Sequence, residues 1–87
     1  GRVMTDISQL TDYLTNNLLK DKGAVALAPD DNLLLSGLLS SLDVVRLVSH
    51  LEGENGIKIK PGEITLKNFK TINAIVQFIE RKAAITA

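Results

Sequence analysis

Three stretches of this chain repeat apolar residues at the spacing of an α-helix, and no cysteine is present to stabilise another architecture by disulfides. A chain of 87 residues buries only a modest core, so it depends on well-packed elements. No metal site is predicted, because His50 is the single histidine and no thiolate is present. The apolar stripes must therefore cover one another, which predicts an all-α bundle.

The first stripe predicts a helix that begins near Thr5 or Asp6 and ends between Lys20 and Gly23. Asp6 is a good N-cap with Gln9 at capping-box spacing, and lysines and a glycine suit the end of a helix. The buried face of this helix is expected to consist of Ile7, Leu10, Leu14 and Leu18.

Two further helices follow. The second starts at Ser40 or Ser41 and ends at Gly53 to Gly56, and the third starts near Thr71, a good N-cap. The expected buried faces are Val44, Leu47, Val48 and Leu51 in the second helix, and Ile72, Ile75, Val76 and Ile79 in the third.

The connections differ in character. Residues 23–39 form a connection too long to stay structureless in a small fold, so we expect a packed loop. Residues 57–60 alternate apolar and basic side chains and are interpreted as an extended connector, because a lone strand would have no partner. A turn at residues 61–62 and a short helical turn at 64–68 complete a three-to-four-helix bundle. The side chains expected to pin the long loop across the helices are Leu33, Leu34, Leu35, Leu38 and Leu39.

We expect one domain over residues 4–87, with residues 1–3 left over from an expression tag ahead of a natural start at Met4. No apolar run approaches the roughly 20 residues that cross a bilayer, and the N-terminus lacks the apolar core of a secretion signal. No membrane partner is therefore expected. The absence of cysteine fits a cytoplasmic protein.

Two function classes are disfavoured by charge and spacing. The net charge is zero, and the lysines of residues 58–70 are offset by nearby glutamates, so no nucleic-acid partner is expected. Catalysis by a serine would need a base beside it. His50 lies more than two helical turns from Ser41 on the second helix, so no enzyme is expected.

The most informative segment is residues 36–45, Ser-Gly-Leu-Leu-Ser-Ser-Leu-Asp-Val-Val. It places Ser41 in the first turn of a helix, directly after a loop that contains Gly37. Free N–H groups and the helix dipole favour a phosphate at such a position. Ser40 is the natural N-cap.

Residues 37–42, Gly-Leu-Leu-Ser-Ser-Leu, resemble the attachment motif of acyl and peptidyl carrier proteins, usually written Gly-x-x-Asp-Ser-Leu or Met. Residues 56–64 resemble the connector that follows the second helix in that family, and residues 69–75 resemble the start of its last helix. The three matches occur in the family's order, and its fold would cover residues 4–82.

The resemblance implies a carrier that performs no catalysis. A phosphopantetheinyl transferase would move 4'-phosphopantetheine from coenzyme A onto Ser41, and the arm would hold an acyl or aminoacyl cargo as a thioester. A ligase or transferase would load the monomeric carrier, and downstream biosynthetic enzymes would receive the cargo. In the family the second helix docks on partners, which makes Leu42, Asp43 and Arg46 the expected contacts. Fatty acyl, polyketide, amino acid and D-alanyl cargoes all stay open.

Three residues depart from the family pattern. Ser40 stands where the family nearly always has Asp; it caps a helix comparably but brings no charge. Arg46, on a helix without a strong acidic bias, predicts dedicated partners rather than the central fatty-acid enzymes. Asn55 replaces a common aromatic residue, which predicts a weaker anchor for the end of the second helix. The alternative function is a carrier-fold interaction module in which Ser41 stays unmodified.

Overall fold

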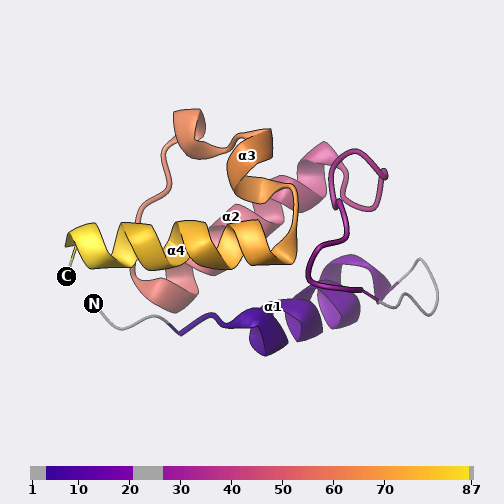
Figure 1. The fold of residues 1–87 in the computed structure, drawn as a ribbon, viewed down its shortest axis with the longest axis horizontal. Helices are drawn as coiled ribbons and strands as arrows, with labels where there is room; N and C mark the ends of the chain where they lie inside the picture. Colours follow the sequence, from indigo (N-terminus) through magenta and orange to yellow (C-terminus); the bar gives the residue numbers. More distant parts are fainter. Residues whose placement is uncertain (1–3, 21–26, 87) are drawn as a thin grey trace.

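The computed structural model of the protein describes residues 4–20 and 27–86. Within these ranges the chain is helical and has no strand, which confirms the predicted all-α class. The expected tag remnant at residues 1–3 and the predicted helix stop at Gly23 lie outside the described residues. Figure 1 shows α1, α2 and α4 as the long elements, with α3 near the start of α4. In chain order the elements are α1 (Ile7–Tyr13), the π-helical turn η1 (Leu14–Leu18), α2 (Ser41–Asn55), the 3₁₀ turn η3 (Pro61–Glu63), α3 (Leu66–Phe69) and α4 (Ile72–Thr86).

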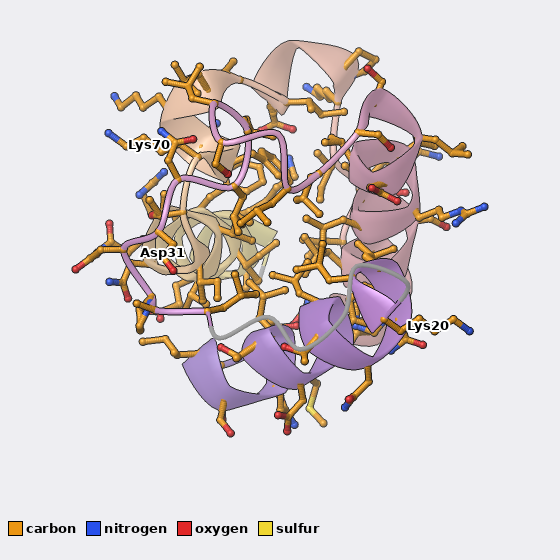
Figure 2. All side chains as sticks on the ribbon, turned by 90° about the vertical axis from the view of Figure 1, so that its right-hand side faces the viewer. Lys20, Asp31 and Lys70 are labelled. Carbon is orange, nitrogen blue, oxygen red and sulfur yellow. The ribbon has the colours of Figure 1, made fainter. Side chains whose placement is uncertain are left out.

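The hydrophobic core forms where the apolar faces of the helices pack together. Side chains from every helix point into a common interior, whereas Lys20 and Lys70 lie at the periphery (Figure 2). The predicted inner face of α4 is confirmed in full, and that of α2 is confirmed except that Val44 is half-buried. Phe69 of α3 adds a fully buried ring tilted against Phe78, with the ring centroids 5.6 Å apart. Burial of these faces is the main stabilising term of the fold.

The first helix differs from its predicted stripe at both ends. Leu10 and Leu14 are buried as expected, but Ile7 is 40% exposed and Leu18 is only half-buried. Leu19 is fully buried in place of Leu18. The reason is the π turn, in which the N–H of Leu19 donates to the carbonyl of Leu14 at 2.8 Å. A π turn holds one residue more than an α turn, so the inward position moves along by one.

The described part of the long loop is packed, as predicted, although not by every leucine. Leu33 and Leu39 are buried, and Leu34 and Leu38 are half-buried against the core. The prediction for Leu35 was wrong, because its side chain is 76% exposed. Leu35 lies in a tight turn. The two residues before it, Leu33 and Leu34, already pack toward the core, so its own side chain points outward.

Backbone hydrogen bonds fasten this loop to the start of α4. The N–H of Leu33 donates to the carbonyl of Lys70 at 2.6 Å, and the N–H of Asn73 donates to the carbonyl of Pro29 at 3.1 Å. The Asn73 amide also donates to the Asp30 carboxylate at 2.7 Å. These bonds give the backbone polar groups of an irregular segment partners within the protein.

The connector after α2 is extended, as predicted. Ile57 and Ile59 are buried, whereas Lys58 and Lys60 are exposed. The alternating isoleucines and lysines therefore point inward and outward in turn. Thr65 then caps the short helix α3 by accepting a hydrogen bond from the N–H of Asn68 at 3.2 Å.

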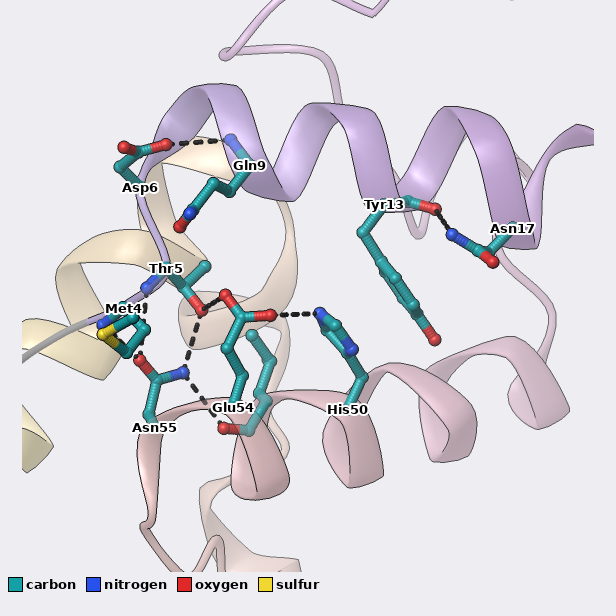
Figure 3. A network of polar contacts seen from close by, with 10 residues as sticks. Met4, Thr5, Asp6, Gln9, Tyr13, Asn17, His50, Glu54 and Asn55 are labelled. Atoms are coloured by element: carbon teal, nitrogen blue, oxygen red, sulfur yellow. Dashed lines mark hydrogen bonds and ion pairs between the residues drawn. The ribbon is translucent and has the colours of Figure 1, made fainter.

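The C-terminal end of α2 is anchored by a polar network rather than by an aromatic ring (Figure 3). The Asn55 side-chain oxygen accepts from the N–H groups of Met4 and Thr5, at 2.9 and 3.2 Å. Its amide nitrogen donates to the hydroxyl of Thr5 and to the carbonyl of Leu51, at 2.9 and 3.0 Å. The Asn55 amide thus joins the end of α2 to the chain entering α1, and its strength relative to an aromatic anchor stays a prediction.

A second polar contact joins the connector to α4. The Lys82 ammonium donates to both carboxylate oxygens of Glu63, at 2.8 and 3.0 Å, and the N–H of Lys60 donates to the same carboxylate at 2.8 Å. The hydrogen bonds from Lys82 and then from Lys60 lower the pKa of Glu63 below its ordinary value of 4.5. This contact holds η3 against the last helix.

Replacing Asn55 by alanine should lower the free energy of unfolding by about 1–3 kcal/mol, because the part-buried N–H and hydroxyl of Thr5 lose their partner. Urea denaturation of Asn55→Ala beside Asn16→Ala, an exposed residue of η1, measures the difference. Equal stability of the two variants would show that the network contributes nothing to the fold.

The lowered pKa of Glu63 fixes the sign of a pH effect. Its contribution to stability is complete above the unfolded-state pKa and is lost as the pH falls through the folded-state value. Glu63→Gln should therefore lower the melting temperature at pH 7. As the pH falls below about 4.5, the melting temperature of the variant should decrease less than that of the parent. Glu80→Gln, an exposed position on α4, is the control and should follow the parent curve.

Candidate functional site

The start of α2 is held by a reciprocal capping box. The Ser40 hydroxyl accepts from the N–H of Asp43 at 3.2 Å, and the Asp43 carboxylate accepts from the N–H of Ser40 at 3.0 Å. The prediction of Ser40 as N-cap is confirmed. Sequence reasoning missed the second half of the box, although the spacing of Asp43 three residues after a serine is its signal.

Ser41 is the first residue of α2 and is exposed. Among the described residues no protein group accepts from its N–H or from that of Leu42, so two donors stay available beside its hydroxyl. The loop before the helix turns at Gly37, whose φ of 78° suits a glycine. A negatively charged group on the Ser41 oxygen would thus meet the positive end of the helix dipole.

Ser41 also lies at the edge of a shallow groove of about 360 Å³ between α2, the long loop and the segment leading into α3. The walls are almost entirely apolar, and Thr65 is the other polar residue among those that line it. The lining residues besides Ser41 are Leu34, Val44, Val45, Ile64, Thr65, Leu66 and Phe69.

The other predicted site residues share the outer surface of α2 near Ser41. Leu42 is 58% exposed and Arg46 is exposed, whereas Asp43 is half-buried with its carboxylate in the capping box. Sequence reasoning missed Val45, which is 62% exposed and borders the groove. Its position follows from the helical spacing, since Val44 and Val48 point inward and leave Val45 outside.

His50 has a structural position on the seam between α1 and α2 (Figure 3). Its ring stacks on Tyr13, with centroids 3.6 Å apart and planes 7° from parallel, and its Nε2 pairs with Glu54 at 2.8 Å. Glu54 in turn accepts from the Thr5 hydroxyl at 2.9 Å. No group of three or more potential metal ligands gathers anywhere in the described part of the chain. Within the same residues, none of the helices has the length and apolar character to span a membrane.

Comparison with protein-family models matches residues 16–79 to the phosphopantetheine attachment site family. The matched region runs from η1 through the capped start of α2 and into α4. The chain belongs to this family. It is therefore a member of the acyl and peptidyl carrier proteins, whose cofactor is covalently attached 4'-phosphopantetheine. A search of curated proteins gives no significant match.

The start of α2 fits the family's cofactor. A phosphodiester needs an accessible hydroxyl, hydrogen-bond donors for its charge and room beside the attachment point. Ser41 offers the exposed oxygen, the N–H groups of Ser41 and Leu42 are available, and the groove opens directly beside them.

Ser40→Ala should lower the free energy of unfolding by about 1 kcal/mol, because the N–H of Asp43 loses its acceptor, whereas Ser40→Asp should stay within a few tenths. Thermal and urea unfolding of the two variants measures this. Ser49→Ala, an exposed mid-helix position, is the control and should be neutral or slightly stabilising. A Ser40→Ala variant as stable as the parent would contradict the capping role.

Proposed function

We propose that this protein is an acyl carrier protein that bears its 4'-phosphopantetheine arm on Ser41 and delivers an acyl or aminoacyl cargo to biosynthetic enzymes. The observation that carries the proposal is the position of Ser41. It is the exposed first residue of a capped helix, directly after the glycine-containing loop, within the region that matches the attachment-site family.

The residues around Ser41 each have a part in this function. Ser40 and Asp43 fix the start of α2, so the Ser41 oxygen keeps one direction relative to the helix. That oxygen supplies the ester linkage to the phosphate, and the N–H groups of the first turn stabilise its negative charge. When bound, the cofactor supplies the thiol on which the cargo is held as a thioester. The chain itself needs no cysteine for this, and it has none.

The surroundings of the serine support delivery rather than catalysis. The one histidine is stacked on Tyr13 and paired with Glu54, on the seam between α1 and α2 rather than beside Ser41. A carrier needs no base at its serine, because the transferase supplies the chemistry of attachment. Tethering the cargo then raises its effective concentration at each enzyme on which the carrier docks.

The partners of such a carrier are a phosphopantetheinyl transferase, an enzyme that loads the cargo and the enzymes that consume it. Ser40 in place of Asp favours one alternative, a carrier-fold interaction module in which Ser41 stays unmodified. The missing carboxylate removes a charge that a transferase could recognise. The two functions differ in a single chemical event at Ser41.

Incubation with coenzyme A and a promiscuous phosphopantetheinyl transferase tests the proposal by intact-protein and peptide mass spectrometry. We expect the mass of one phosphopantetheinyl group, localised to Ser41. The gain should be absent in Ser41→Ala and retained in Ser8→Ala, an exposed serine of α1.

Ser40→Asp separates the two ways in which this experiment could fail. If only the Ser40→Asp variant is modified, Ser41 is an attachment site with altered transferase recognition. If neither variant is modified by any transferase tested, the carrier function is refuted and the unmodified interaction module takes its place.

A further inference from the structure

The exposed surface of α2 carries a single charged side chain. The exposed residues of this helix are Ser41, Leu42, Val45, Arg46, Ser49 and Gly53. Arg46 is the one charged residue among them, and it is positive. Every acid of α2 is instead engaged within the molecule. Asp43 caps the helix, the Glu52 carboxylate accepts from the N–H of Ile59 at 2.8 Å, and Glu54 contacts Thr5 and His50.

The surface has an apolar part beside Ser41. Leu42 and Val45 lie one turn apart and are 58% and 62% exposed. Val45 shares the groove beside Ser41 with Ile64 and Leu66, which are 38% and 47% exposed. Exposed apolar side chains gathered around a reactive position are typical of the centre of a protein interface.

Next to this apolar part lies a hollow of about 430 Å³ on the seam between α1 and α2. Arg46 and Ser49 reach it from α2, and Tyr13 and Asn17 reach it from the first helical segment. Burial raises the pKa of the Tyr13 phenol, an effect that the charge of Arg46 partly opposes, so the phenol is a hydrogen-bond donor at neutral pH. The remaining lining residues are Leu18 and His50.

The hollow therefore presents a guanidinium and several neutral donors, and no acid lines it among the described residues. Donor groups of this kind suit a carboxylate, which accepts several hydrogen bonds at once and pairs with arginine. Asp12 and Glu54 line a neighbouring hollow, and Glu54 is paired with His50.

Any enzyme that acts on the Ser41 oxygen must cover the residues that flank it. Accepting the carrier function proposed above, we infer that the phosphopantetheinyl transferase docks on α2 by an apolar contact with Leu42 and Val45 and inserts an acidic side chain into the hollow beside Arg46. The polarity of this contact is opposite to that of a carrier with an acidic second helix. A transferase with a basic docking surface would meet Arg46 as a like charge.

The test measures KM and kcat for modification of the full chain by the transferase of the source organism, with coenzyme A. Arg46→Glu should raise KM about tenfold or more, because it opposes two carboxylates. Val45→Thr, which keeps the side-chain shape but replaces a methyl group with a hydroxyl, should raise KM about threefold or more. In both variants kcat should change little, because neither residue supplies the reacting oxygen.

Two matched controls isolate the surface. Lys58→Glu makes the same charge reversal on the connector beyond α2, and Ile7→Thr makes a similar apolar-to-hydroxyl change on α1. Both should stay within about twofold of the parent KM. Circular dichroism and thermal unfolding establish that all four variants are folded, since each position is exposed. Exchange of an acidic residue of the transferase for arginine should restore the modification of Arg46→Glu.

Each outcome decides one question. If the parent chain is modified but Arg46→Glu and Val45→Thr behave like their controls, the docking inference is overturned and the carrier function stands. If the parent chain is never modified, the carrier function itself fails. If light scattering shows a dimer that Val45→Thr converts to a monomer, a second copy of the chain covers this face and the inference is again overturned.

Discussion

The residues proposed to act in this protein depend on α2 keeping one rotation about its own axis. The inner stripe of α2 is locked into the core, its first turn is fixed by the Ser40–Asp43 capping box, and its last residue is fastened through Asn55 to the chain entering α1. A helix constrained at both ends and along one side cannot roll. The opposite side, which carries Ser41 and Arg46, is therefore presented in a constant orientation.

Periodicity predicted most of this arrangement, because burial dictates it. The inner stripes of α2 and α4, the N-caps at Asp6 and Ser40 and the extended connector follow from local rules of spacing and capping. The burial of Leu19 in place of Leu18 could not be predicted, since an α-helix and a π turn fit the same apolar pattern until packing selects one. The position of Ser41 followed from the attachment motif rather than from periodicity.

Two of the features that sequence reasoning missed depend on contacts between distant residues. Asn55 and Met4 are 51 residues apart, so no local pattern links them, and the anchor is visible only in the fold. The hollow around Arg46 likewise needs side chains from two helices. Leu35 has the apolar side chain of a core residue but is exposed, because a short turn can direct only some side chains inward.

The π turn bears on how the length of such a chain can vary. A π turn contains one residue more than the α turn that covers the same rotation, so the first helical segment can lose a residue and become regular while its inward leucines realign. In α2 the loss of one residue would rotate everything beyond it by about 100° and carry inner side chains to the surface. A one-residue deletion is therefore expected to disturb the fold less in the first helical segment than within α2.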